Sequence, residues 1–389
     1  MYQDKLYDML NIIHDKHLDI NFHISKQELS SYLNQLLNEH PINNEYDFYY
    51  YSNVVIKKIF DCFDSHTKLG WKSSSLLPVR FQCIDDQVYI LKTDKEYQDL
   101  LYGKLLSINH VPIQTIMDEI EKMTPYSTKE FLNTQIETSL YHVNKLKSLP
   151  SMDSSCTDFL FCVENHGIKS HKIIKEGRNH FPRENYQIKI DDVMILTYSK
   201  CSEDYPNQML DFVQEIKKQA DFYQISKFIV DIRGNQGGNS NLIKPLVSFL
   251  EDKEVVTLVD SYVFSAGRFA AVDLYNIGSP LIGTQIGTSL NSFGNISITD
   301  MDPFYLAVSN RYFYFTNENN RLIEHVIFDQ KSFLEFKNNL ENKKYFTPSF
   351  LPITSYVHTT IEDYEACCDT FIEKGKKILN KKEKVIISK

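Results

Sequence analysis

The chain has 389 residues, and its composition excludes several classes of protein. Hydrophobic residues make up 42% of the sequence and aromatic residues 13%, which is enough to bury a large core and excludes a disordered chain. The formal net charge is −9 and there is no long basic run, so a dedicated nucleic-acid binder is excluded. No run of 18 apolar residues offers a transmembrane span.

The seven cysteines are scattered and form no C-x-x-C pair, which excludes zinc-ribbon and thioredoxin-like sites. Their odd number and irregular spacing indicate a reducing compartment. The first residues, MYQDKLYDMLNIIHDKHLDI, are amphipathic and lack the apolar core and cleavage site of a secretory signal. The cytoplasm is therefore the expected location. No His/Cys/Asp cluster has ligand spacing, so neither a metal nor another cofactor is expected.

The first part of the chain, residues 1–75, is expected to form an N-terminal helical domain. Apolar residues recur at helical spacing, for example at Leu6, Met9 and Ile13, and Pro41 separates the second helix from the third.

The second part, residues 76–150, is expected to mix strands with helices. LLPVRFQCIDDQVYIL alternates apolar and polar residues, which predicts strands, and a helical stretch runs from Pro112 to about Leu149. The serine-rich segment 148–158 is the best candidate for a linker, and a hairpin follows it.

Strands and helices alternate between residues 188 and 300, within a third domain predicted to span residues 151–389. This order predicts a largely parallel α/β sheet with crossover helices. Active-site groups in such sheets usually lie at the carboxyl ends of strands. One terminal helix is predicted from TTIEDYEACCDTFIEKGKKIL onward.

Three segments carry residues that suit chemistry, and each also has a purely structural interpretation. Ser265 stands between an apolar strand and a helix, where it would be a nucleophile beside the free N–H of Ala266, or simply a helix cap. The loop DIRGNQGGNS contains Gly237 and Gly238, whose spacing fits neither a P-loop nor a dinucleotide motif. It would supply an oxyanion donor or form a plain turn. His66 follows Ser65 in DCFDSHTKLG and would be a base or an exposed loop histidine.

Together these segments resemble the tail-specific, or C-terminal-processing, serine peptidase family, which is related to the tricorn core and to interphotoreceptor retinoid-binding protein. DIRGNQGG, the strand–Ser–Ala–Gly–helix segment and GSPLIGTQIGTSLNSFGN carry the specific part of the likeness. DSHT resembles the family's Asp-x-His-Thr segment, YGKLLSINHVPIQTIMDEI its PDZ-like strand, and the terminal helix its closing helix. The resemblance covers nearly the whole chain and implies a crotonase-like ββα spiral for the catalytic domain.

The chain departs from the family at the residue that many members use as a base. Their lysine would lie at Thr288, and no lysine occurs between Lys253 and Lys331. The tricorn-like branch instead uses a histidine beside a serine, supported by a glutamate, and Ser65–His66 matches that pair. Glu324 is the nearest candidate for the glutamate, with Glu318 and Glu335 as alternatives. Arg268 stands where many relatives carry an acid.

The resemblance implies an endopeptidase that acts on a peptide or protein substrate and needs no cofactor. Ser265 would attack the carbonyl, His66 would move the proton, and Ser65 and Glu324 would orient the imidazole. The N–H groups of Gly237 and Ala266 would hold the oxyanion, with Gly238 in place of Gly237 as the fallback. A homo-oligomer is compatible with the sequence. Two alternatives stay open, which are an inactive family member that binds peptides and a crotonase-type acyl-CoA enzyme.

Overall fold

The computed structural model describes residues 2–177, 181 and 183–386 and has a mixed α/β architecture with several sheets, as the sequence predicts. The chain divides into two compact units. Unit 1 comprises Met1–Phe181, Asn291–Tyr314 and His325–Pro348, and unit 2 comprises Pro182–Leu290, Phe315–Glu324 and Ser349–Lys389. Within the described residues, no helix has both the length and the apolarity needed to cross a bilayer.

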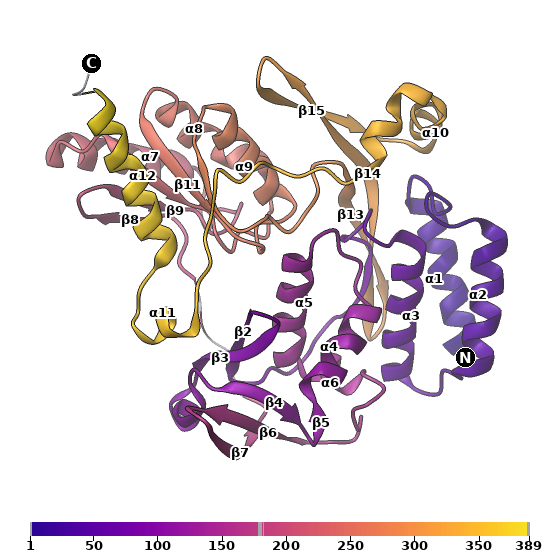
Figure 1. The fold of residues 1–389 in the computed structure, drawn as a ribbon. Helices are drawn as coiled ribbons and strands as arrows, with labels where there is room; N and C mark the ends of the chain where they lie inside the picture. Colours follow the sequence, from indigo (N-terminus) through magenta and orange to yellow (C-terminus); the bar gives the residue numbers. More distant parts are fainter. Residues whose placement is uncertain (1, 178–180, 182, 387–389) are drawn as a thin grey trace. The chain divides into compact units, whose positions relative to one another are not determined.

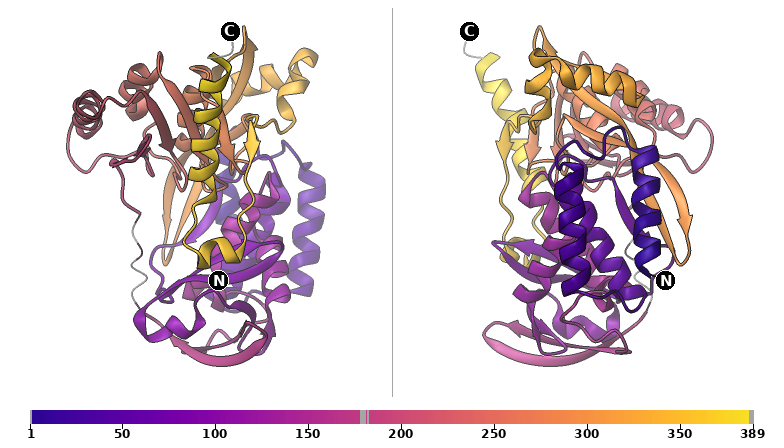
Figure 2. Two further views of the ribbon diagram at one scale, coloured as in Figure 1. Left: turned by 60° about the vertical axis from the view of Figure 1, so that its left-hand side comes forward. Right: turned by 90° about the vertical axis from the view of Figure 1, so that its right-hand side faces the viewer.

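Unit 1 begins with the predicted helices, which lie side by side in Figure 2: α1 (Tyr2–Lys16), α2 (Lys26–Glu39) and α3 (Glu45–Phe60). Ser25 begins α2 through a capping box with Glu28, and Asn44 caps α3 by accepting the N–H groups of Tyr46 and Asp47. The break between α2 and α3 is therefore confirmed. The inward faces of these helices share one core with the strands that follow.

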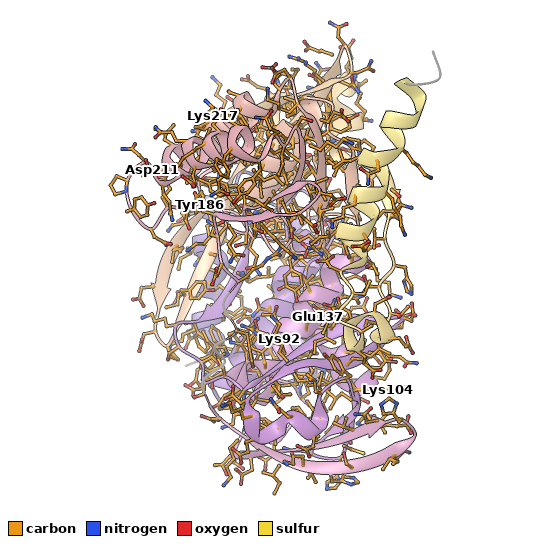
Figure 3. The ribbon with its side chains drawn as sticks, turned by 90° about the vertical axis from the view of Figure 1, so that its left-hand side faces the viewer. Lys92, Lys104, Glu137, Tyr186, Asp211 and Lys217 are labelled. Carbon is orange, nitrogen blue, oxygen red and sulfur yellow. The ribbon has the colours of Figure 1, made fainter. Side chains whose placement is uncertain are left out.

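The middle of unit 1 is a sheet with the order β2-β3-β4-β6-β7, in which β5 pairs with β4. Its elements are β2 (Val79–Ile84), β3 (Gln87–Thr93), β4 (Lys104–Ile108), β5 (Val111–Pro112), α4 (Ile113–Lys122), α5 (Lys129–Tyr141), α6 (Val143–Lys147), β6 (Asp158–Asn165) and β7 (Ile168–Lys175). Helix α5 packs on β2, where Glu137, labelled in Figure 3, accepts the Cys83 N–H at 2.7 Å and the Gln82 amide at 2.8 Å.

The serine-rich segment 148–158 is not an exposed linker. Leu149 and Met152 are buried, and strand β6 after the segment pairs with β4 before it. The β6–β7 hairpin itself is confirmed.

A second sheet, most of whose residues belong to unit 1, pairs segments that lie far apart in the sequence. It has the order β1-β14-β13 and consists of β1 (Lys68–Trp71), β13 (Ser292–Met301) and β14 (Phe304–Glu318), with β15 (Arg321–Ile327) pairing with β14. Leu69 pairs with Leu306 and Gly70 with Tyr305. Helix α10 (Gln330–Asn338) follows, and Phe333 on it packs against Phe293.

Unit 2 is a three-layer α/β unit (Figure 1) whose sheet has the order β16-β12-β11-β10-β9-β8. Its elements are β8 (Gln187–Ile190), β9 (Met194–Thr197), α7 (Gln208–Tyr223), β10 (Lys227–Asp231), α8 (Lys244–Leu250), β11 (Glu254–Val259), α9 (Ala266–Asn276), β12 (Leu281–Gly283), β16 (Ser355–Tyr356), α11 (Ile361–Glu365) and α12 (Thr370–Ile386). Strands β9 to β12 and β16 run parallel and only β8 is antiparallel, so the predicted parallel sheet is confirmed.

Helices α7, α8 and α9 cover one face of this sheet, and α12 covers the other. Gly375 lets α12 approach the sheet closely, because a Cβ there would lie 3.1 Å from Ile229 Cδ1. The prediction of a single terminal helix is wrong, because the structure has two helices there. The chain breaks between α11 and α12, where Cys367 has a φ of 54°.

Candidate active site

Ser265 lies on a strained turn between β11 and α9. Its backbone has φ 53° and ψ −121°, a region that side chains other than glycine rarely adopt. A serine cap normally has extended backbone and accepts a helix N–H, but Ser265 makes no side-chain capping bond. Ser265 is therefore not an ordinary helix cap. Strain of this kind persists only where surrounding structure holds it, and it concentrates at functional sites.

The glycine loop after β10 lies directly against this turn. A Cβ placed on Gly237 would lie 2.9 Å from Ser265 Cβ and 2.8 Å from the Ala266 nitrogen. Gly238 is confined on another side, because its Cβ would lie 2.1 Å from the Cys201 carbonyl oxygen. The structure thus brings together four of the residues singled out from the sequence, in a space that admits no further side chain at either glycine.

The backbone N–H groups of the Ser265 turn and of the glycine loop have different hydrogen-bond partners. The Gly267 and Arg268 N–H groups donate within the turn, to the carbonyls of Phe264 and Ser265. Ala266 is the first residue of α9, so its N–H precedes the first intrahelical bond. The Gly237 N–H donates to Asn235 Oδ1 at 3.0 Å. An oxyanion at Gly237 would have to share or displace that bond.

Asn235 is a positioning residue that sequence reasoning missed. Its fully buried amide donates to the Tyr198 carbonyl at 3.0 Å, and its Oδ1 also accepts the Cys201 thiol at 3.3 Å. Its own carbonyl accepts the Phe264 N–H at 3.0 Å. One side chain and its backbone therefore hold together the segment after β9, the glycine loop and the Ser265 turn. The only signal in the sequence is a polar residue among glycines.

The charged residues of the DIRGN segment are structural. Arg233 donates to both oxygens of Asp231, at 2.9 and 2.7 Å, and to both oxygens of Asp369, at 3.0 and 2.8 Å. Asp369 also accepts the N–H groups of Phe371 and Ile372 at the start of α12. Burial acts to raise the pKa of Asp231, but the charge and hydrogen bonds of Arg233 lower it overall. The pair anchors α12 to the end of β10.

Arg268 has a structural explanation as well. It is buried, and its Nη1 donates to the carbonyls of Ser289 at 2.6 Å and Leu290 at 2.9 Å. These residues follow Thr288, which is itself buried. Arg268 therefore ties α9 to the segment that follows Thr288, where the sequence resemblance leads us to look for a lysine.

We expect Gly237→Ala to lower the melting temperature clearly more than Gly278→Ala. Both glycines have positive φ, +111° and +84°, so each alanine is strained on the backbone. A Cβ at Gly278 meets nothing within 4 Å, whereas at Gly237 it meets the Ser265 turn. Thermal unfolding followed by circular dichroism measures the difference. Equal losses would show that the loop and the turn are not in tight contact.

His66 lies in unit 1, in a buried turn that is built around Asp64. Asp64 Oδ1 accepts the backbone N–H groups of His66 at 2.8 Å and Thr67 at 3.1 Å, and also the Ser309 hydroxyl at 2.8 Å. His66 is only 8% exposed, so the interpretation as an exposed loop histidine is wrong. The turn fixes the backbone of His66 by bonds to one carboxylate.

A second histidine completes this cluster. His17 Nδ1 accepts the Asp19 N–H at 3.1 Å, which places the ring proton on Nε2, 3.3 Å from Asp64 Oδ2. The His17 ring lies between Phe60 and Phe293, with centroids 4.4 Å away on each side. Burial acts to raise the pKa of Asp64, but His17 and the donors around the carboxylate lower it to about 2.

The two residues predicted to orient the base belong to different units. Ser65 belongs to unit 1 and lines a cavity there. Glu324 belongs to unit 2, is exposed on β15, and lines a different cavity with Phe269 and Asp273. The alternatives Glu318 and Glu335 are exposed too.

The predicted site therefore consists of two groups, one in each unit. Ser265, Ala266, Gly237 and Gly238 form the group in unit 2, and Ser65 and His66 the group in unit 1. Among the described residues, no cluster of three or more His, Cys, Asp or Glu side chains could hold a metal ion.

The sequence matches no protein-family model and no curated protein sequence. Its fold does match solved structures. Mature CPAF is 11% identical, with a TM-score of 0.61 over 97% of this chain and 96% of that one. Mature CPAF complexed with lactacystin also has 11% identity and a TM-score of 0.61, over 99% and 98% of the two chains.

A photosystem II D1 C-terminal processing protease matches at 10% identity with a TM-score of 0.41, over 79% of this chain and 87% of that one. The chain thus has the fold of mature CPAF, and a C-terminal processing protease is among the structures that it matches, as the predicted resemblance implies.

Proposed function

We propose that this protein is a serine endopeptidase of the tail-specific type that acts through a Ser–His mechanism. The observation that carries the proposal is the strained Ser265 turn, packed against Gly237 and the Ala266 nitrogen with no capping role for the serine. A nucleophile needs an exposed hydroxyl next to N–H donors aimed at the developing oxyanion. The fold shared with CPAF supports the same conclusion.

In the proposed reaction, Ser265 Oγ attacks the scissile carbonyl carbon while His66 accepts the hydroxyl proton. The tetrahedral oxyanion is held by the Ala266 N–H and by the N–H of Gly237 or Gly238. Collapse breaks the C–N bond, and His66 returns the proton to the leaving amine. Water then hydrolyses the acyl-enzyme with His66 again acting as the base. Ser65 and Glu324 are proposed to orient the imidazole.

The finer architecture also belongs to this proposal. We assign residues 1–75 to a helical domain, 76–150 to a PDZ-like segment and 151–389 to a crotonase-like catalytic domain. Strand β7, whose residues are mostly exposed, gives the sheet of unit 1 an edge on which an extended peptide could pair. The seven free cysteines support a reducing compartment, the cytoplasm.

A fluorophosphonate probe tests the nucleophile directly, because it reacts covalently with an activated serine. We expect one equivalent of label on Ser265, located by peptide mass spectrometry, and none in Ser265→Ala. Ser261→Ala, four residues earlier in the same loop, is the matched control and should label normally. Lactacystin, with which CPAF is complexed, is a second probe for the same residue.

An unlabelled but folded protein would contradict the peptidase proposal. It would favour the second candidate, a catalytically inactive module that binds peptides. One observation favours that alternative, namely the Gly237 N–H already bonded to Asn235 rather than free for an oxyanion. Peptide binding without turnover, measured by calorimetry, would then establish the binding role.

A further inference from the structure

Unit 1 contains a cavity of about 300 Å³. Of the residues that line it, only Ser65 has a role in the proposed peptidase reaction. It is lined by residues of α3, β1, α5, α6 and β14 and of the segment after α4. This volume is at the lower end of the range for sites that bind small molecules. Its wall combines apolar side chains, such as Met123 and Phe131, with lysines and hydroxyl groups.

The charge of this cavity is one-sided. Three lysines line it, Lys68, Lys72 and Lys145, and none of its lining residues is acidic. Lys72 is neutralised by Asp300 at 2.5 Å and Asp302 at 3.0 Å. In the part of the chain that the structure describes, no carboxylate forms an ion pair with Lys68 or Lys145.

The surroundings of Lys145 disfavour the charged form of its side chain. Burial, and then the charge of Lys68, lower the pKa of Lys145 to about 7. The neighbouring His142 stays neutral, because burial and the charges of Lys145 and Arg80 lower its pKa to about 3. Two ammonium groups without a counter-charge next to a cavity are stabilised when an anion enters it.

Trp71 supplies an independent observation. It lines the same cavity, and its indole nitrogen is buried without a hydrogen-bond partner. Buried donors are normally satisfied, so an unsatisfied indole N–H needs an explanation. Asn53, by contrast, is fully bonded to the backbone of Tyr49 and Leu69.

We propose that this cavity binds a small organic anion, a carboxylate or phosphate ester with an apolar body, held by Lys68 and Lys145. The ammonium groups supply the charge, and the Trp71 ring forms part of the cavity wall around the ligand. The apolar body packs against Met123 and Phe131. Because Ser65 also lines the cavity, a bound anion lies next to the residue that precedes His66. The proposal does not depend on peptidase activity.

Trp71 is the only tryptophan of the chain, so fluorescence excited selectively at tryptophan reports on this residue of the cavity wall. Phenyl phosphate, benzoate and inorganic phosphate are titrated into the full chain, with sodium chloride at equal ionic strength as the reference. We expect a saturable change in Trp71 emission with phenyl phosphate or benzoate. The tighter ligand identifies the charged group, and weaker binding of inorganic phosphate identifies the contribution of the apolar body.

Lys145→Met and Lys68→Met should each weaken the binding at least about tenfold, a change that fluorescence titration resolves easily. Lys92→Met is the matched control and should bind like the wild type, because Lys92, labelled in Figure 3, is an exposed lysine on β3 that does not line the cavity. Without ligand, Lys145→Met should melt at a higher temperature, since it removes a half-buried ammonium group that has no ion-pair partner among the described residues, which also shows that the variant is folded.

Two results would overturn the proposal. One is the absence of any saturable fluorescence change or thermal stabilisation up to about 10 mM of each anion, which would exclude a Kd of about 1 mM or tighter. The other is equal binding by the wild type and Lys145→Met. Neither result bears on Ser265, whose labelling is measured separately.

Discussion

His66→Ala is expected to lower kcat for peptide hydrolysis by about 10²–10⁴-fold, the usual contribution of a positioned general base. KM should change little, because the base acts on the proton in transit and not on the bound substrate. The comparison is made with His14→Ala, which removes an exposed histidine of the same unit and should keep full activity. Ser65→Ala should lose less than His66→Ala, because it removes only an orienting group.

The pH profile of the wild type separates a histidine from a lysine mechanism. A histidine base loses its proton near pH 6.5 without special help, so kcat/KM should rise through one ionisation between about pH 6 and 7.5. A lysine base would need a depressed pKa, and Thr288 occupies its place in the sequence. Near-normal turnover in His66→Ala, or loss of activity in Lys253→Ala, would contradict the assignment.

The elements that the sequence predicts correctly are those whose signal is local. The apolar residues of α1 to α3 recur at helical spacing because one face of each helix is buried. The strands from β9 to β12 are mostly apolar because both faces of the sheet are covered by helices. Both patterns can be recognised within a few consecutive residues of the sequence. The turn at Ser265 is local too, since a strand must end and a helix begin there. These features locate the candidate nucleophile in the sequence, although the strained turn that presents it is held by Asn235 and the glycine loop.

The features that the sequence does not predict depend on partners far along the chain. The break between α11 and α12 occurs where Asp369 caps α12 and bonds to Arg233, which is 136 residues away. Asn235 acts through Tyr198 and Phe264, and His17 through Asp64. Nothing in the sequence around His17 or around Asp64 indicates that the two side chains lie close together in the fold.

Asp64→Asn is expected to lower the free energy of unfolding by about 1–3 kcal/mol for each buried donor that loses its acceptor. The matched control is Asp61→Asn, the same change three residues earlier on a half-exposed carboxylate, which should cost little. Chemical denaturation at pH 7 measures both variants.

The reason for the large loss lies in the direction of the donors around Asp64. Thr67 Oγ1 already accepts the Ser309 N–H at 3.0 Å, so its own proton must point to Asp64 Oδ2. The Nε2 of His17 carries the ring proton, because Nδ1 accepts the Asp19 N–H, and it lies 3.3 Å from the same oxygen. An asparagine amide can satisfy the Oδ1 side, but its NH₂ group would then meet two donors.

The same pair sets the acid stability of the wild type. Because the pKa of Asp64 is lowered to about 2 in the fold, its contribution is complete above the unfolded pKa of about 3.9 and is lost as the pH falls toward 2. The difference between the wild type and Asp64→Asn should therefore be constant from pH 7 to about pH 5 and shrink below pH 4. If the difference in the free energy of unfolding does not shrink in acid, Asp64 stabilises the fold through packing and hydrogen bonds that do not require its negative charge. In that case the fixed backbone of His66 would depend on the turn itself and not on the His17–Asp64 pair.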